Sequence, residues 1–140
     1  MNAQSKDARA VARDRLRKQA GRRAEDAALA HLQAAGLRPW ARNYRCKAGE
    51  IDLVLLEGSV LVLAEVRYRT RVEYGGAAAS VTWRKQRRLA RAAGHLLLTH
   101  ASLRGLPVRF DVIAMTAAEG ACAAGAPAWR IEWIKNAFQV

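Results

Sequence analysis

One stretch of the chain, Glu50 to Arg69, constrains the fold more than any other, because its pattern is that of two strands and a tight turn. Two runs rich in Val, Leu and Ile, Glu50–Leu56 and Val60–Arg69, are separated by a short Glu-Gly-Ser segment. Gly58 followed by Ser59 matches the glycine-first pattern of a two-residue type II′ turn, which predicts a β-hairpin. Both faces are apolar near the turn, as is typical of strands in the middle of a sheet.

The turn also determines which residues of the two strands face each other. Near the turn the predicted partners are apolar: Ile51–Val66, Leu53–Ala64, Leu55–Val62, Val54–Leu63 and Leu56–Leu61. At the open end Asp52 is predicted to lie opposite Glu65, and Glu50 opposite Arg67. Two carboxylates about 5 Å apart on one face repel each other and lower stability. The pattern leaves three compensations open: a divalent cation, with Mg²⁺ or Mn²⁺ favoured by oxygen ligands; neutralisation by Arg67 and other cations; or protonation of one carboxyl group.

The charge of the chain favours a polyanionic partner. Among 140 residues, 24 Lys and Arg against 12 Asp and Glu give a net charge of +12, which favours nucleic acid over a membrane, although such charge also serves solubility alone. A hydrophobic fraction of 51% is ample for the core of one domain. The apolar runs are too short for a membrane span, and the first residues lack the apolar core of a signal peptide, so a cytoplasmic location is expected.

The first part of the chain is predicted to divide into a basic arm and a helix. Residues 1–20 carry many cations without a steady apolar stripe, which predicts a disordered arm or a frayed helix that becomes ordered on nucleic acid. From Gly21 to about Ala35 an apolar stripe predicts a helix that ends at Gly36. Glu25 lies on the apolar face, one turn from that predicted start. Its carboxylate favours the positive end of the helix dipole, pairs with a neighbouring arginine, or faces the same metal as the hairpin carboxylates; the pattern leaves these alternatives open.

Four more elements are predicted around the hairpin, so that residues 21–140 form a single domain. They are a strand from Leu37 to Arg45, a helix from about Trp83 to Thr99 with Thr82 as its N-cap, a strand from Pro107 to Met115 and an edge strand from Trp129 to Ile134. The first half of the second helix carries Arg84, Lys85, Arg87, Arg88 and Arg91. Positive charge near a helix N-terminus opposes the helix dipole, which favours nearby phosphates, with a solvated face as the alternative.

The helix with Glu25, the hairpin with Asp52, the EVR triplet at 65–67 and the following basic helix together resemble the core of PD-(D/E)XK nucleases, also called the restriction-endonuclease-like fold. More narrowly, several segments resemble the bacterial YraN family and occur in the same order: GRRAEDAALAHLQAAGL, RNYR, GEIDLV, EVRYRT, RKQRRL, RFDV and NAF. The resemblance covers residues 21–138. It implies an α/β fold with an αβββαβ core, in which a mixed central sheet is flanked by helices.

The resemblance also implies roles for particular residues. Asp52 and Glu65 match the metal-binding carboxylates of the motif, and the carbonyl of Val66 completes that side of the metal site. Glu25 matches the helix glutamate of resolvase-like members, whereas Arg67 departs from the family by standing at the motif's lysine position. The implied catalytic set is Glu25, Asp52, Glu65 and Arg67, with Mg²⁺ or Mn²⁺ as the cofactor. The implied contacts to nucleic acid are Arg69, Arg84, Lys85 and Arg88.

The function implied by the resemblance is that of a metal-dependent DNA endonuclease, which hydrolyses phosphodiester bonds and is similar to Holliday-junction resolvases. Arg67 keeps the positive charge of the motif lysine but is never deprotonated, so phosphate binding survives the exchange better than water activation does. The alternative is a nucleic-acid-binding module on a nuclease scaffold with weak or lost catalysis. DNA is the expected partner in both cases, and the oligomeric state is left open, with a homodimer as one alternative.

Overall fold

The computed structural model describes residues 3–69, 81–117 and 128–139 of the chain. In chain order the elements are α1 (Ala3–Ala34), β1 (Arg38–Cys46), β2 (Gly49–Glu57), β3 (Val60–Arg69), α3 (Trp83–Thr99), the short 3-10 helix η1 (Ala101–Leu103), β4 (Val108–Ala117) and β5 (Trp129–Phe138). A helix, three strands, a second helix and a further strand follow one another as the sequence predicts. The expected α/β class with an αβββαβ-type core is therefore confirmed.

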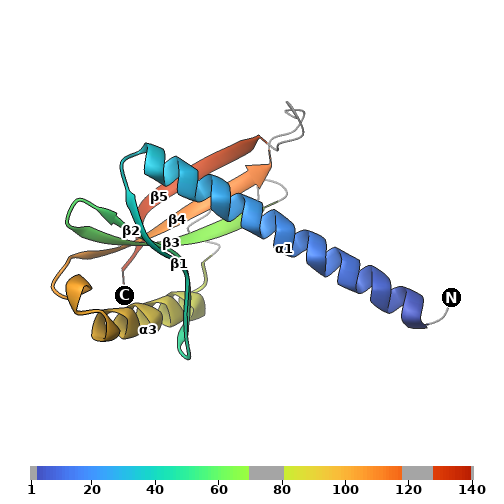
Figure 1. Cartoon of the computed structure of the whole chain (residues 1–140), viewed down its shortest axis with the longest axis horizontal. Coiled ribbons are helices and arrows are strands. Elements are labelled where there is room, and N and C mark those ends of the chain that lie inside the picture. Colours follow the sequence, from blue (N-terminus) through green and yellow to red (C-terminus); the bar gives the residue numbers. More distant parts are fainter. Residues whose placement is uncertain (1–2, 70–80, 118–127, 140) are drawn as a thin grey trace.

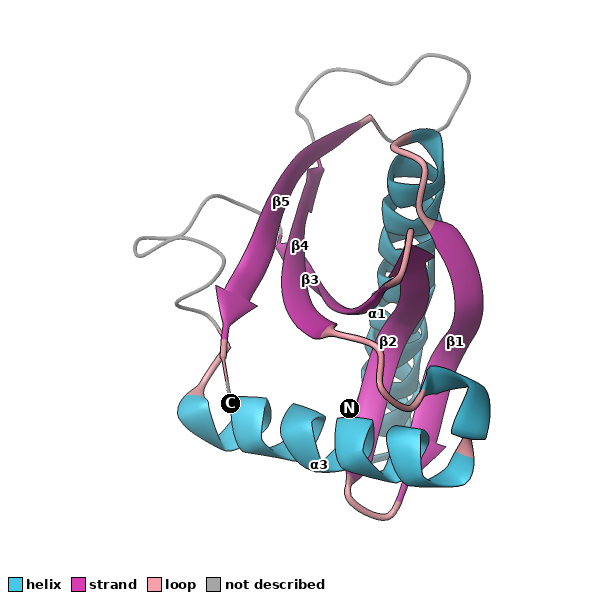
Figure 2. Cartoon of the chain, turned by 90° about the vertical axis from the view of Figure 1, so that its left-hand side faces the viewer, coloured by secondary structure: helices cyan, strands magenta, loops and turns pink. Residues whose placement is uncertain are grey.

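All five strands form one sheet in the order β1-β2-β3-β4-β5. Strands β3 and β4 run parallel, whereas the other neighbouring pairs are antiparallel. A parallel pair needs a crossover connection, and α3 lies in the segment that joins β3 to β4. Figures 1 and 2 show the result, a curved sheet with α1 on one face and α3 on the other.

Each long helix buries an apolar stripe against its own face of the sheet. On the α1 face the helix contributes Ala24, Ala28 and Leu32, which pack against Leu53, Leu55, Val62, Ala64, Ile113 and Met115. On the α3 face the helix contributes Leu89, Ala92, Ala93 and Leu96, which pack against Ile51, Val54, Leu61, Leu63, Val112 and Ala114. Strands β2 and β3 are thus buried on both faces, which agrees with the apolar pattern of the hairpin.

The first helix is longer than the sequence pattern predicts. It begins at Ala3, so the predicted start at Gly21 is wrong and the segment expected to be disordered or frayed is helical from residue 3. Ala, Arg, Lys and Gln dominate this segment, and because all four have high helix propensity the helix continues without an apolar stripe. The side chains of residues 6–19 are exposed, and Figure 1 shows this half of α1 extending beyond the sheet.

Most other boundaries lie within a few residues of those predicted. Helix α3 has the predicted bounds, and Thr82 caps it because its Oγ1 accepts a hydrogen bond from the Lys85 amide at 3.2 Å. Strand β5 continues past the predicted end at Ile134, because a bulge at Asn136 (φ 51°) lets the strand return to β4. Among the described residues no helix is long and apolar enough to cross a lipid bilayer.

Candidate metal and nucleic-acid site

The predicted hairpin register holds near the turn and fails at the open end. Gly58 has φ 59°, as a glycine-first turn requires, and four predicted pairs are formed: Leu53–Ala64, Val54–Leu63, Leu55–Val62 and Leu56–Leu61. The ladder between β2 and β3 goes no further than Leu53–Ala64. The predicted strand pairs Ile51–Val66, Asp52–Glu65 and Glu50–Arg67 are therefore wrong.

The two strands separate because the alternation of side chains along β2 breaks at Asp52. Leu53 packs on the α1 face, yet Ile51, two residues away, packs on the α3 face. In β1, Asn43 lies at the same level, between the paired residues on either side, and has a left-handed φ of 51°. The β1–β2 ribbon therefore turns over here, which leaves the Asp52 side chain pointing across to β3.

The Asp52 carboxylate takes the place of the missing ladder contact. Its Oδ2 accepts a hydrogen bond from the Val66 amide at 2.9 Å. Since the amide and carbonyl of one strand residue point toward the same neighbouring strand, the Val66 carbonyl faces β2 as well. The reversal at Asp52 thus brings the Asp52 carboxylate next to the backbone of Val66. A regular ladder would have kept these groups apart.

Asp52 and Glu65 meet although their strands do not pair there. Burial and the charge of Glu65 raise the pKa of Asp52 to about 7, while the hydrogen bond from Val66 and the charge of Lys85 oppose that rise. The raised pKa favours protonation of Asp52 near neutral pH. The predicted proximity of the pair is therefore present, and protonation is one of its compensations.

Cations supply the second compensation. The Glu65 side chain is only 4% exposed, and its Oε1 contacts the ammonium of Lys85, which reaches it from the first turn of α3. Arg67 approaches the same oxygen, with its Nη1 at 3.9 Å. Glu50, predicted to face Arg67, instead forms an ion pair with Arg45 in β1, Oε1 to Nε 3.5 Å. Neutralisation by cations, one of the three alternatives, is therefore present, and the raised pKa of Asp52 favours protonation as well.

Glu25 approaches from the opposite face of the sheet. Because α1 begins at Ala3, Glu25 is far from the first turn, and the explanation through the helix dipole is wrong. The predicted arginine partner exists, since Arg42 Nε lies 3.5 Å from Glu25 Oε1, but that buried oxygen has no hydrogen bond. Burial first, and then the charge of Asp52, raise the pKa of Glu25, while Arg42 opposes the rise.

The carboxylate pair lies in a pocket of about 440 Å³ between the β1–β2 turn and α3. Its lining residues are Arg45, Cys46, Gly49, Glu50, Asp52, Glu65, Lys85, Arg88 and Leu89. The two elements approach closely at Gly49, where an added Cβ would lie 3.2 Å from the Arg88 carbonyl oxygen. The pocket therefore has acidic groups at its base and basic groups on its helical wall, and Glu25 does not line it.

A family model describes the relatives of this chain. The model named Uncharacterised protein family UPF0102 matches residues 24–115, a stretch that includes Glu25, the kinked hairpin and α3. The chain belongs to the UPF0102 family. This confirms the predicted relationship at the level of the YraN-like group.

The chain is similar to other UPF0102 proteins over nearly the whole length of those proteins. The protein from Saccharophagus degradans is 48% identical over 118 residues, which are 84% of this chain and 91% of that protein. The protein from Pseudomonas entomophila is 48% identical over 120 residues, 86% of this chain and 93% of that protein. The protein from Stutzerimonas stutzeri is 45% identical over 119 residues, 85% of this chain and 93% of that protein.

The donor set of this UPF0102 protein fits a hard divalent cation. Asp52 and Glu65 line one pocket and could supply carboxylate oxygens, and the Val66 carbonyl, which is expected to face β2, could supply a further oxygen. Within the described parts of the chain, no group of three or more His, Cys, Asp or Glu side chains is arranged to hold a metal ion. Glu25 does not line the pocket that contains Asp52 and Glu65, and its predicted role as a metal ligand stays a prediction.

The predicted contacts to nucleic acid are only partly gathered at this pocket. Lys85 and Arg88 line it, and Arg84 is exposed on the same first turns of α3. Arg69 ends β3, next to residues 70–80, which lie outside the described residues, and it is not one of the residues that line this pocket. Helix α3 thus carries most of the predicted basic surface.

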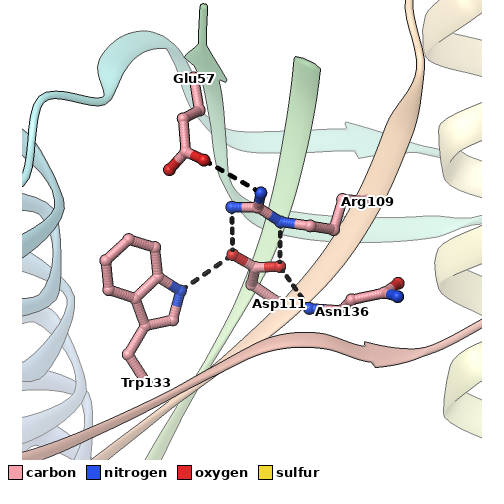
Figure 3. A network of polar contacts seen from close by, with 5 residues as sticks. All are labelled: Glu57, Arg109, Asp111, Trp133 and Asn136. Carbon is pink, nitrogen blue, oxygen red and sulfur yellow. Dashed lines mark hydrogen bonds and ion pairs between the residues drawn. The ribbon is translucent and has the colours of Figure 1, made fainter.

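Sequence reasoning missed another buried carboxylate, Asp111 in β4, which Figure 3 shows with its partners. It is 0% exposed and accepts two hydrogen bonds from Arg109 at 2.8 and 3.0 Å. It accepts one more from Trp133 Nε1 and one from the Asn136 amide, both at 2.9 Å, and Arg109 also reaches Glu57 at 3.2 Å. Arg109 and Asp111 belong to the RFDV segment, and Asn136 belongs to the NAF segment. Both segments carry the family resemblance, and this was the signal in the sequence that could have pointed to the network.

Proposed function

We propose that this UPF0102 protein is a divalent-cation-dependent nuclease that hydrolyses phosphodiester bonds of DNA in the pocket between the β1–β2 turn and α3. The observation that carries the proposal is that the half-buried Asp52 and the buried Glu65 line one pocket with a basic wall and act on each other by charge. Such a pair lowers stability unless a cation or proton compensates it, and perturbed carboxyl groups in a pocket are typical of functional sites.

In this proposal the acidic residues of the pocket bind the cation and the basic residues bind phosphate. Asp52, Glu65 and the Val66 carbonyl would hold Mg²⁺ or Mn²⁺, which when bound supplies a Lewis acid and a more acidic water. Lys85 and Arg88 on the wall bind phosphate groups by charge. Arg67, next to Glu65, has a fork of donors suited to phosphate oxygens, and because it is never deprotonated it orients groups rather than removing a proton.

Glu25 has a different role in this proposal. It influences Asp52 by charge from the far side of the sheet, and its buried Oε1 has no hydrogen bond. A negative neighbour favours the protonated form of Asp52 and strengthens the attraction of Asp52 for a cation. We therefore treat Glu25 as a positioning residue of a cytoplasmic nuclease whose partner is DNA.

One observation favours a second candidate function, a nucleic-acid-binding module without efficient catalysis. Lys85 and Arg67 both approach Glu65, so protein cations already compensate the carboxylate pair. Arg67 also stands at the motif's lysine position. In a module of this kind the pocket would bind phosphate with its basic wall and would have no need of a divalent cation.

A cleavage screen separates the two candidates. Wild-type protein is incubated with linear, nicked, flapped and four-way-junction DNA in Mg²⁺ or Mn²⁺, beside Asp52→Ala and the matched control Glu50→Ala. Glu50 lines the same pocket but pairs with Arg45 rather than with Glu65. The nuclease predicts cleavage by the wild type and the control, and a loss of at least about 1000-fold in Asp52→Ala. Wild-type protein that binds all four substrates and cleaves none of them would support the binding module.

A further inference from the structure

We propose that Lys85 is a built-in counter-ion, which occupies the place of the divalent cation at Glu65 and, once displaced by that cation, turns to bind a phosphate of the DNA. The inference rests on the proposed function, because it concerns the same pocket. It adds that cation binding and DNA binding assist each other through one side chain.

The first step is the position of Lys85 against Glu65. The Glu65 side chain is 4% exposed, and the ammonium of Lys85 contacts its Oε1. A divalent cation shared by Asp52 and Glu65 needs that same carboxylate and would repel the ammonium beside it. The ion pair and the bound cation therefore oppose each other, and in this proposal the cation displaces Lys85 when it binds.

The second step is that Lys85 is free to move while its backbone is fixed. The amide of Lys85 is held by the Thr82 cap, so the residue keeps its place in the first turn of α3. Its side chain is 41% exposed and ends a flexible four-carbon stem. Displaced from Glu65, the ammonium would join Arg88 on the wall of the pocket. Each ligand thereby removes a contact that opposes the other, which is a positive coupling.

The first test measures Mn²⁺ binding by calorimetry for the wild type, Lys85→Gln and Arg88→Gln. Arg88→Gln is the matched control, because it removes the same charge from the same wall, and no ion pair between Arg88 and Glu65 is present in the described structure. Lys85→Gln is expected to bind Mn²⁺ about tenfold more tightly than the wild type, since the competing contact to a charged group is lost. Arg88→Gln is expected to gain less than about threefold. Equal gains, or no gain in Lys85→Gln, would overturn the inference.

The second test measures DNA affinity by fluorescence anisotropy, with Ca²⁺ as a binding cation and with a chelator. Lys85→Gln is expected to leave the affinity within about twofold in chelator and to lower it about tenfold in Ca²⁺, whereas Arg88→Gln lowers it in both conditions. Equal losses in both conditions for Lys85→Gln would contradict the proposed displacement.

The outcomes also separate this inference from the nuclease itself. The two expected patterns without cleavage of any substrate would keep the role of Lys85 and overturn the nuclease. Cation-dependent cleavage with an unchanged Mn²⁺ affinity in Lys85→Gln would keep the nuclease and overturn the role of Lys85. An absence of Mn²⁺ binding in all three proteins would overturn both.

Discussion

Acidic side chains lie away from solvent in two places in the molecule, and the two places differ in how completely these side chains are hydrogen-bonded. Asp111 lies inside the sheet, and both of its oxygens accept hydrogen bonds from Arg109 and from groups of β5 (Figure 3). Asp52 and Glu65 instead lie in one pocket, where burial and the charge of Glu65 raise the pKa of Asp52 and where Lys85 and Arg67 compensate Glu65. A carboxylate with a complete set of partners supports the fold, whereas a carboxylate pair with unfavourable burial is typical of a site that binds a ligand.

The difference follows from where each group lies in the sheet. Asp111 stands at the bulge between β4 and β5, where the extra residues of β5 present the Asn136 amide to it. Asp52 stands where β2 leaves β3, and in the described structure it accepts a hydrogen bond from the Val66 amide while the Glu65 carboxylate, also on β3, acts on it by charge. The bulge therefore completes one acidic site, and the separation of strands leaves the other open to the pocket.

The largest expected effect comes from breaking the Asp111 network. Asp111→Asn removes the charge that balances the half-buried Arg109 and is expected to lower the free energy of unfolding by about 3 to 5 kcal/mol, measured by urea denaturation at pH 7. The control is Glu57→Gln, which removes a more exposed partner of the same arginine and is expected to cost less than about 1 kcal/mol. Similar costs for the two changes would mean that Asp111 is no more important to the fold than a surface charge.

The next effect tests whether the basic wall of the open site binds the polyanion. Charge reversal of Arg84, Lys85 and Arg88 to Glu is expected to weaken DNA binding by about 100-fold at moderate salt, because binding driven by phosphate contacts depends on these cations. Wild-type affinity is expected to fall steeply with salt and to change little with DNA sequence.

The matched control reverses three cations of the projecting half of α1, Arg9, Arg13 and Arg17. It is expected to weaken DNA binding only a few-fold, since their exposed helix extends away from the pocket. Anisotropy titrations of the two triple variants at one salt concentration make the comparison. Equal losses would argue against α3 as the main binding surface.

A third prediction concerns the cost of burying Asp52. Its folded-state pKa is raised from 3.8 to about 7, so the folded state holds a proton that the unfolded state releases, and stability falls as the pH rises through that window. Asp52→Asn removes this penalty and keeps an oxygen for the Val66 amide. It is expected to raise the free energy of unfolding by about 2 kcal/mol at pH 8 and by little at pH 4. Urea denaturation at both pH values checks this, and a loss of stability at pH 8 would place Asp52 with Asp111 as a structural residue.

The smallest effect compares the two arginines. Arg109→Lys loses a two-pronged contact to Asp111 and is expected to lower the free energy of unfolding by about 1 to 2 kcal/mol. Arg67→Lys, at a half-exposed position 3.9 Å from Glu65, is expected to change it by less than about 0.5 kcal/mol and to keep or raise cation-dependent cleavage. Thermal denaturation and the cleavage assay serve as measurements. A nuclease made inactive by Arg67→Lys would show that the guanidinium fork itself is required.

Much of the site was predictable because it depends on local pattern. The turn at Gly58 and the apolar pairs beside it placed Asp52 and Glu65 at the same end of the hairpin, and Thr82 marked the start of the helix that carries Lys85. What failed was the assumption of an unbroken ladder. Nothing near Asp52 in the sequence signals that the strand alternation reverses there, because the cause lies in β1, where Asn43 has a left-handed backbone. The prediction of where α1 starts was wrong for another reason. Residues of high helix propensity extend the helix beyond the part whose apolar stripe packs on the sheet.

The sequence by itself determined the order of the elements, the hairpin with its turn, the apolar faces of the helices and the family to which the chain belongs. These follow from the periodicity of side chains and from turn and cap residues, which act over a few neighbouring positions. Only the tertiary structure decided that Asp52 leaves the ladder to meet Val66 and Glu65, that Lys85 contacts Glu65 while Glu50 pairs with Arg45, and that Asp111 accepts hydrogen bonds from β5. Contacts between residues far apart in the chain depend on how strands bend and pack, and one bulge or one left-handed residue redirects them without changing the local pattern.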